Sequence, residues 1–303
     1  MLVHKEDKMD TYENQLVSAV ITTHNRKDLL KRAIDSVLAQ TYPNMELIVV
    51  SDASTDGTDE MCSRRNDLKY ISIPKAESRG GNYARNLGIN AAKGEYVAFL
   101  DDDDTWFPTK IEKQVKLIEE KKCECVYCLR LMQRINNGTV QGQTLEGLTY
   151  KCEGDLSKKI FRHSFTSTSC LLVTNKILKR VGGFDENLNK LQEYELLIRI
   201  SQMSSIYYCH KEPLVFYNID DSDGSRISND PMRLPIAKDY IESKHHYLLR
   251  KSGLLNRFLH EDWMLTALYG NARECQFNWQ TAQLALYYYI TLPFRKLLIK
   301  LFS

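Results

Sequence analysis

The chain has 303 residues, of which 43% are hydrophobic and 26% are charged, a composition typical of a globular protein rather than a disordered one. Lysine and arginine number 41 against 39 acidic residues. The resulting net charge of +2 gives no support for a nucleic-acid-binding protein, which needs a strong basic excess.

The first 15 residues are mostly polar and lack the apolar stretch of a secretory signal. No run in the chain reaches the ~18 apolar residues that are needed to cross a bilayer. The eight cysteines are scattered through a chain too large to need disulfide stapling. These features together predict a cytoplasmic protein with reduced thiols.

The next part of the chain alternates short apolar runs with amphipathic stretches. Apolar runs rich in Val and Ile predict strands, and apolar residues that recur on one face at intervals of four predict helices. Gly94 follows the last of these helices and is expected to stop it. This alternation predicts an α/β fold with a mainly parallel sheet and helices on both faces. The expected elements are strands at 16–23, 46–51, 68–73 and 96–100, long helices at 26–40 and 80–93, and a short helix after Thr58.

The strand at 96–100 runs directly into four consecutive carboxylates, Asp101 to Asp104. Four adjacent negative charges at the end of a buried strand repel one another unless a cation is shared between them. In an extended chain Asp101 and Asp103 point one way, and Asp102 and Asp104 point the other. Because oxygen ligands favour hard cations, the run predicts a Mg²⁺ or Mn²⁺ site.

Two other interpretations of the acidic run remain at this point, a solvated loop and a calcium loop. The calcium loop fits poorly, because no glycine stands at its sixth position. Ligands of parallel α/β sheets bind outside the carboxyl ends of the strands, where Thr23 and Asp52 are also expected. The acidic run and these two residues are therefore expected to meet in one crevice. No glycine-rich phosphate-binding motif of the ATPase or NAD-enzyme kind is present.

The second half of the chain is less regular. A helix is expected at 109–121, and Asn136 to Gly138 predict a turn between two strands within 123–160. Another helix begins near Leu191. Because two residues turn a helix by about 200°, Glu193 and Glu195 point in nearly opposite directions, and at most one of them faces the crevice.

Three cysteines, at 123, 125 and 128, have a spacing that matches no common zinc site. We expect them to pack in the core, with Cys123 and Cys125 on one face of a strand. An all-helical segment is expected over about 232–303. Its end, residues 287–302, mixes aromatic, aliphatic and basic side chains, which fits either a helix in a membrane interface or a helix docked on the main domain.

Taken in order, these motifs resemble family 2 of the inverting glycosyltransferases, which share the GT-A fold. The resemblance covers about residues 16–220 and implies a nucleotide-binding half at 16–104 and an acceptor half at 105–220. It leaves a polar segment at 1–15 and a helical region at 221–303, with a candidate membrane-association tail. The segments that carry it are Val17–Arg26, Leu47–Thr58, Gly80–Gly88, Ala92–Trp106, Gly183–Glu186 and Gln192–Glu195.

The resemblance implies roles for residues of the nucleotide-binding half. Asp52, with the region of Thr23 and Asn25, would hold the uracil and ribose end of a nucleotide sugar. Asp102 would lie near the ribose or the donor sugar, and Arg79 would lie near the phosphates.

The resemblance also implies a metal site and a catalytic base. Asp103, with Asp101 beside the same ion, would bind the Mn²⁺ or Mg²⁺ that bridges the two phosphates. Glu193 occupies the place of the base that takes the proton from the acceptor, where many relatives have Asp.

The sequence is similar to bacterial enzymes that add glucose or galactose to GlcNAc-pyrophosphate-undecaprenol. The implied function is metal-dependent, inverting transfer of a hexose, glucose first and then galactose or GlcNAc, from a UDP-sugar to such a lipid-linked acceptor. This places the protein in O-antigen, lipopolysaccharide or capsule biosynthesis, with a β-linkage formed at the cytoplasmic face of the inner membrane. The alternatives are a sugar nucleotidyltransferase and a sugar-nucleotide-binding protein without turnover.

Overall fold

The structure is a computed structural model that describes residues 15–136, 139–146, 152–220, 230, 232–274 and 291. The predicted polar segment up to residue 14 and the predicted tail at 287–302, Thr291 apart, lie outside the described residues. The elements are β1 (Val17–Thr23), α1 (Lys27–Leu38), β2 (Met45–Asp52), α2 (Thr58–Ser63), β3 (Lys69–Ile73), η1 (Lys75–Glu77), α3 (Gly81–Ala91), β4 (Tyr96–Asp101), β5 (Thr105–Trp106), α4 (Lys110–Lys121), β6 (Cys125–Asn136), β7 (Thr139–Glu146), η2 (Lys159–Arg162), η3 (Thr168–Cys170), β8 (Leu171–Thr174), α5 (Asn175–Val181), α6 (Gln192–Ser201), β9 (Ile206–Asp220), α7 (Arg233–Lys244), α8 (His246–Lys251) and α9 (Leu254–Glu274).

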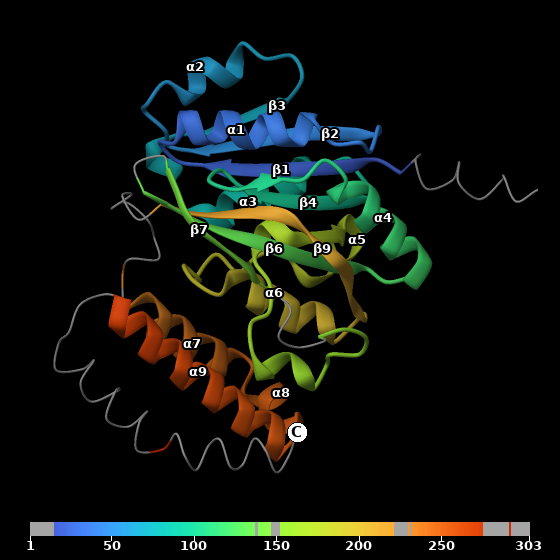
Figure 1. Cartoon of the computed structure of the whole chain (residues 1–303), viewed down its shortest axis with the longest axis vertical. Helices are drawn as coiled ribbons and strands as arrows, with labels where there is room; N and C mark the ends of the chain where they lie inside the picture. Colours follow the sequence, from blue (N-terminus) through green and yellow to red (C-terminus); the bar gives the residue numbers. More distant parts are fainter. Residues whose placement is uncertain are drawn as a thin grey trace, which may run out of the picture.

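The strands of the described chain form one sheet in the order β3-β2-β1-β4-β8-β6-β9-β5, with β7 paired to β6 (Figure 1). The four strands β1 to β4 are parallel to one another, which confirms the parallel arrangement expected for the first half. Beyond β4 the sheet is mixed, because β8 runs antiparallel to both β4 and β6, whereas β9 is parallel to β6.

Helices cover both faces of this sheet and bury two separate cores. Along β1, Val20 points into one core, and Ala19 and Ile21 point into the other, as side chains of a strand covered on both faces must alternate. Helices α1 and α4 close the core of Ala19 and Ile21. Helices α3, α5 and α6 close the core of Val20.

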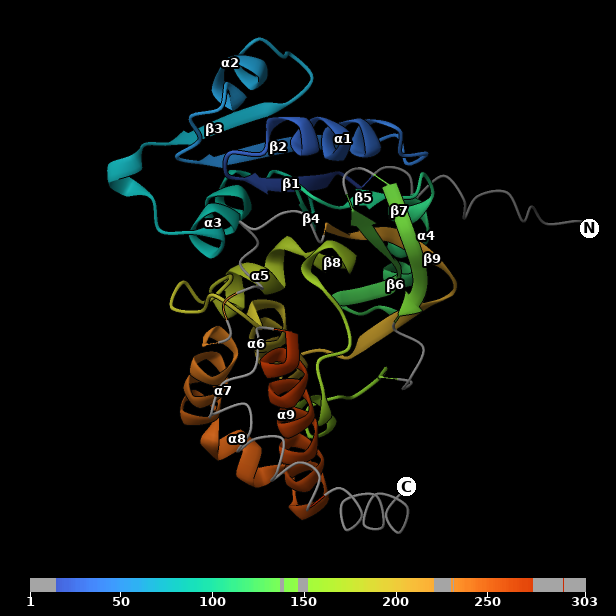
Figure 2. The ribbon, with the colours of Figure 1, turned by 60° about the vertical axis from the view of Figure 1, so that its left-hand side comes forward.

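The C-terminal helices α7 to α9 lie at the end of the molecule away from α2 (Figures 1 and 2). They dock on the sheet domain, because Ala237 and Ile241 of α7 and Met264 of α9 are buried in the same core as α3 and α6. None of the helices in the described ranges is both long enough and apolar enough to cross a bilayer.

Cys123, Cys125 and Cys128 are buried free thiols, as expected. The expectation that Cys123 and Cys125 share one face of a strand is wrong. Cys123 precedes β6 and packs with α1 and α4, whereas Cys125 begins β6 and packs in the opposite core.

Gly94 has a different role from the expected helix stop. Helix α3 already ends at Ala91, and Ala92 is extended. A Cβ at position 94 would lie 2.6 Å from both the Leu16 carbonyl oxygen and Ser18 Oγ. Gly94 is therefore needed because the backbone of the chain entering β4 approaches β1 closely.

Candidate active site

The carboxyl ends of β1, β2 and β4 bring three predicted site residues to one edge of the sheet. β1 lies between the other two strands, with Thr22 opposite Asp101 and Thr23 opposite Ser51, the residue before Asp52. Thr23, Asp52 and Asp101 are thus neighbours although they are up to 78 positions apart, as the register requires. We call this place the carboxyl edge.

Asp52 carries a buried polar atom without a partner in the described structure. The Gly80 backbone N–H donates to Asp52 Oδ2 at 3.0 Å, and Gly80 has a φ of +89° that favours glycine. Asp52 Oδ1 is buried without a hydrogen bond among the described residues, whereas the buried Thr23 hydroxyl lies beside Asp102 and helps to lower the pKa of that carboxyl. A buried polar atom left unpaired costs about 1 to 3 kcal/mol, so a ligand that donates to Asp52 Oδ1 would be stabilised here.

Asn25 and Arg79 are placed differently from each other. Asn25 has a φ of +54°, and its side-chain oxygen accepts the Thr55 N–H at 2.6 Å. Its own N–H donates to Ser54 Oγ at 3.0 Å, so Asn25 ties the loop after β1 to the loop after β2. Arg79 is exposed just before α3, and its guanidinium lies 4.9 Å from the centre of the Tyr83 ring.

The tetra-aspartate is not extended as expected: β4 ends at Asp101, and the Asp104 N–H donates to the Asp101 carbonyl at 3.0 Å, which closes a turn. The side chains of Asp101 and Asp103 are 27% and 22% exposed, whereas Asp102 and Asp104 are buried. Arg26 Nη1 lies 3.2 Å from Asp102 Oδ1 and 3.3 Å from Asp103 Oδ2. Burial and then the charge of Asp103 raise the pKa of Asp102 to about 7, and Arg26 opposes this shift.

Asp101 pairs with an arginine of α3. Arg85 Nη2 donates to Asp101 Oδ1 at 2.6 Å, and Arg85 Nη1 donates to Asn82 Oδ1 at 3.1 Å. Neither Arg85 nor Arg26 was among the residues predicted for the site. The available signal was their position inside the matched motifs, next to the residues that were predicted.

The buried carboxylate of Asp104 stabilises the acidic loop through hydrogen bonds. Ser169 Oγ donates to Asp104 Oδ2 at 2.6 Å and accepts the Asp101 N–H at 3.1 Å. The Asn218 N–H donates to Asp104 Oδ1 at 3.1 Å. Burial and the charges of Asp103 and Asp101 raise the pKa of Asp104 well above its ordinary value. This carboxyl therefore holds the loop in shape and does not face solvent.

Glu193 lies in the first turn of α6 and is partly exposed. Burial by the surrounding protein and the charge of Asp101 raise the pKa of Glu193, and the charges of Arg130 and Arg85 oppose this rise. The Glu193 carboxyl thus stands within electrostatic reach of Asp101 and Arg85. The next acid on the helix, Glu195, points into the protein and is fully buried.

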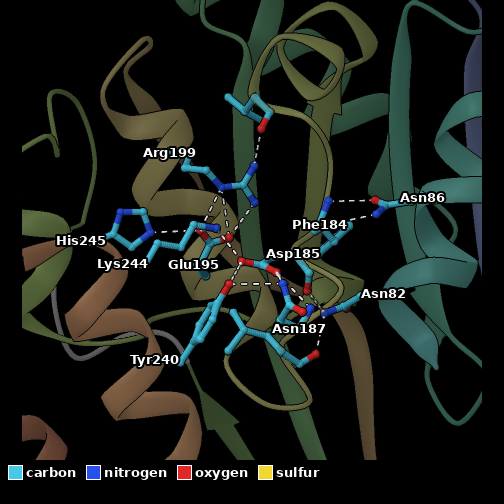
Figure 3. A network of polar contacts seen from close by, with 12 residues as sticks. Asn82, Asn86, Phe184, Asp185, Asn187, Glu195, Arg199, Tyr240, Lys244 and His245 are labelled. Atoms are coloured by element: carbon cyan, nitrogen blue, oxygen red, sulfur yellow. Dashed lines mark hydrogen bonds and ion pairs between the residues drawn. The ribbon is translucent and has the colours of Figure 1, made fainter. Parts of the chain in front are cut away.

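A loop held by α3 leads into α6 (Figure 3). Asn86 Nδ2 donates to the Phe184 carbonyl at 2.9 Å, and the Phe184 N–H donates to Asn86 Oδ1 at 2.8 Å. Asn82 Nδ2 donates to the carbonyls of Asp185 at 2.8 Å and Leu188 at 2.7 Å. The helix that carries Arg85 therefore also positions the loop before Glu193.

The donor set of the carboxyl edge fits a hard divalent cation held partly by a substrate. Asp101 and Asp103 offer partly exposed carboxylate oxygens, which are the ligands that Mg²⁺ and Mn²⁺ prefer. Among the described residues no three acidic, His or Cys side chains gather as a metal-ligand group. Asp101 and Asp103 would supply two ligands of such an ion, and phosphate or water would supply others.

The sheet and its acidic carboxyl edge define the class of GT-A glycosyltransferases, and solved structures confirm the fold. Staphylococcus aureus TarS in complex with UDP-GlcNAc superposes with a TM-score of 0.59 and 18% identity over 86% of this chain and 81% of that one. A mannosyltransferase of Pyrobaculum calidifontis in complex with GDP-Man and Mn²⁺ superposes with a TM-score of 0.54 and 19% identity. The match covers 92% of this chain and 82% of the mannosyltransferase. The chain belongs to glycosyl transferase family 2, whose model matches residues 18–182.

Relatives in sequence support this membership. An uncharacterized glycosyltransferase of Rickettsia typhi is 33% identical over 71% of this chain and 67% of its own length. The UDP-Glc:alpha-D-GlcNAc-diphosphoundecaprenol beta-1,3-glucosyltransferase WfaP of Escherichia coli is 41% identical over 36% of this chain. This chain covers 43% of the length of WfaP and 62% of the length of an uncharacterized glycosyltransferase of Rickettsia prowazekii. In both cases it spans less than two thirds of the relative.

Proposed function

We propose that this glycosyltransferase moves a hexose from a UDP-sugar to a lipid-linked sugar acceptor, with inversion to a β-linkage. Glucose is the first candidate for the hexose, before galactose or GlcNAc, and GlcNAc-diphospho-undecaprenol is the candidate acceptor. The names of WfaP and of the TarS complex support a UDP-sugar donor, and WfaP supports the acceptor. The product would belong to O-antigen, lipopolysaccharide or capsule biosynthesis.

The observation that carries the proposal is the convergence of Thr23, Asp52 and the acidic run at the carboxyl ends of β1, β2 and β4. The charge of Asp101 acts on Glu193 although 92 positions separate them in the sequence. An acceptor hydroxyl needs a base on one side and a stabilised leaving group on the other, and Glu193 and the acidic run would supply these from two different segments.

The donor would be bound by the polar side chains of the carboxyl edge. Asp52 Oδ1, which has no partner among the described residues, and Thr23 Oγ1 would receive hydrogen bonds from the uracil and ribose, with Asp102 near the ribose or donor sugar. Asp101 and Asp103 would hold Mn²⁺ or Mg²⁺, and the Mn²⁺ complex of the mannosyltransferase supports a divalent ion. Such an ion stabilises the negative charge that the departing diphosphate gains.

Glu193 would take the proton of the acceptor hydroxyl as that oxygen bonds to the anomeric carbon. The bond from this carbon to the diphosphate oxygen breaks, and UDP leaves. Attack from the face opposite the diphosphate inverts the anomeric centre. The raised pKa of Glu193 suits this task, because a more basic carboxylate removes a hydroxyl proton more effectively.

The lipid-linked acceptor would be met at the cytoplasmic face of the inner membrane. Tyr247 and Leu254, 59% and 82% exposed, lie at the corner between α8 and α9 beside the exposed side chains of Arg250, Lys251 and Arg257. We call these five residues the α8–α9 corner. Exposed apolar groups beside basic ones match the chemistry of an anionic lipid surface.

A donor screen with a synthetic lipid-diphosphate-GlcNAc acceptor and Mn²⁺ tests the proposal. Release of UDP from one UDP-hexose, dependent on the acceptor, is the expected result. Release of pyrophosphate from a nucleoside triphosphate and a sugar phosphate would instead identify the protein as a nucleotidyltransferase. Binding of UDP-sugars without turnover across the panel would instead identify the protein as a sugar-nucleotide-binding protein.

A further inference from the structure

The buried carboxylate of Glu195 joins α6 to the C-terminal helix α7 (Figure 3). Arg199, on α6 itself, donates to it from Nη2 at 2.6 Å. Lys244 Nζ, at the end of α7, lies 2.8 Å from Glu195 Oε1, and Nε2 of His245, the residue between α7 and α8, lies 2.9 Å from the same oxygen. Burial alone would raise the pKa of Glu195, but its bonds to His245, Arg199 and Lys244 hold that pKa at about 2.

Lys244 also binds the loop that precedes α6. Its Nζ lies 2.5 Å from Asp185 Oδ2, and the Tyr240 hydroxyl donates to the same oxygen at 2.8 Å. One ammonium group therefore bridges the loop through Asp185 and the helix through Glu195.

This bridge continues to the end of β4. The Asp185 carbonyl accepts from Asn82, Asn82 Oδ1 accepts from Arg85, and Arg85 binds Asp101. Lys244 thus stands at one end of an unbroken series of polar contacts that reaches the acidic edge. Lys244 also contacts α6, the helix of Glu193, directly through Glu195.

The start of α6 depends on such contacts because it lacks local support. Its N-cap, Leu191, has a φ of +60° and makes no side-chain hydrogen bond to the helix. A left-handed conformation is unfavourable for a non-glycine residue, and the missing cap removes a further local stabilisation. Glu193 lies in this first turn, so its position is set by the tertiary network rather than by the cap.

We propose that Lys244 is a positioning residue for the transfer reaction: by clamping Asp185 and Glu195 together, it fixes the first turn of α6 and with it the place of Glu193. This inference rests on the proposed function. It assigns part of the catalytic geometry to α7, a helix outside the residues that the family model matches.

The test compares full-length Lys244→Met with Lys238→Met. Met keeps the length of the lysine stem and removes the charge. Lys238 lies on the same helix and binds Glu242 of that helix, so its loss removes one ion pair without releasing α6. A third variant, Lys244→Arg, retains cationic donors in a different geometry.

Lys244→Met is expected to lower kcat by about 10- to 100-fold, the cost of a small misplacement of a reacting group. The KM for the UDP-sugar and the calorimetric affinity for UDP should stay near the wild-type values, because Asp52 and Thr23 are untouched. Lys238→Met should keep the wild-type kcat, and Lys244→Arg should recover part of the loss. A wild-type kcat in Lys244→Met, equal losses in both Met variants, or a parallel loss of UDP binding would each overturn the proposal.

Amide hydrogen exchange separates this proposal from the proposed function. Exchange at residues 192–198 should be faster in Lys244→Met than in Lys238→Met, whether or not the right donor has been found. Unchanged exchange there would reject the positioning role even in an active transferase. Absence of turnover in the wild type with faster exchange in Lys244→Met would reject the proposed function and leave the clamp standing.

Discussion

Arg85 Nη2 lies 2.6 Å from Asp101 Oδ1, so the carboxylate that ends β4 is paired with a cation of the protein itself. Arg26 does the same for Asp102 and Asp103. The four consecutive aspartates predicted that a metal ion alone neutralises their charge. The structure divides this task, because two arginines already offset part of the repulsion.

Asp103→Ala is expected to remove most of the gain in UDP affinity that Mn²⁺ provides, because one of the two carboxylates that would hold the ion is lost. Calorimetry of UDP binding with Mn²⁺ and with a chelator measures this gain. Asp67→Ala is the control, since Asp67 pairs with Arg65 on the surface. An undiminished Mn²⁺ effect in Asp103→Ala would show that the ion is bound elsewhere.

Glu193→Gln is expected to lower kcat by about 100- to 10,000-fold, the usual contribution of a general base, while UDP binding persists. Glu193→Asp should retain part of the activity and measures how far the carboxylate must reach. The base works when ionised, and its pKa is raised. As the pH is lowered, the wild-type kcat should therefore decrease, with a midpoint above the ordinary pKa of a Glu side chain. Glu193→Gln should lack this acidic limb of the pH profile. An identical limb in the variant would assign the base to another residue.

Glu195→Gln is expected to destabilise the fold at neutral pH by about 3 to 5 kcal/mol, because Arg199 and Lys244 lose a buried partner. The folded pKa of Glu195 is about 2 against an ordinary 4.5. Its ionised form thus stabilises the fold above pH 4.5, and this contribution, up to about 3 kcal/mol, is lost as the pH falls from 4.5 to about 2.

Urea unfolding across this window measures the effect. The difference in unfolding free energy between the wild type and Glu195→Gln should narrow as the pH falls. The exposed Glu120→Gln serves as the control and should differ little from the wild type at any pH. A constant difference between the wild type and Glu195→Gln would mean that Glu195 is not ionised in the fold.

Reversal of charge at the α8–α9 corner, with Arg250→Glu and Lys251→Glu together, is expected to weaken sedimentation with vesicles that contain an anionic phospholipid. Each basic residue near such a surface contributes about 1 kcal/mol, so the double variant should bind at least tenfold less. Lys179→Glu with Arg180→Glu, two exposed residues of α5, is the charge-matched control. Equal effects of both pairs would show that net charge, and not the corner, governs binding. A variant without residues 285–303 tests the predicted tail separately.

Gly94→Ala is expected to lower the free energy of unfolding by about 1 to 3 kcal/mol, because its Cβ would meet the Leu16 carbonyl at 2.6 Å. Gly142→Ala is the matched control, as nothing lies within 4 Å of a Cβ there. Thermal unfolding of both variants measures the difference. Equal melting temperatures would mean that the backbone at position 94 can shift without cost.

The first four strands and the helices between them were predictable because their signals are local. The apolar run before Asp101 and the amphipathic pattern at 26–40 gave the strand and the helix that the structure shows at Tyr96–Asp101 and Lys27–Leu38. The exposure of the four aspartates was predicted from an extended chain, but it arises in a turn that begins where β4 ends at Asp101. Register then brought Thr23 and Asp52 to the same edge.

The second half was harder because its structure depends on distant partners. Strand β9 was not expected, since it is defined by parallel pairing with β6, which begins 81 residues earlier. The pairing of Arg26 with Asp102 and the brace from Ser169 to Asp104 likewise depend on the folded chain. Lys244 carried no signal, because a lysine on an exposed helix face most often indicates only solvation.

The two hydrogen bonds between Asn86 and Phe184 have an evolutionary consequence. A side-chain amide here takes the place of a neighbouring strand, accepting from and donating to the same backbone unit. Recombination between genes of this family that separated position 86 from position 184 would have to preserve both the amide and the path of the loop. A chimaera that takes only one of these two positions from a relative is therefore expected to lose both hydrogen bonds unless it keeps the amide and the path of the loop.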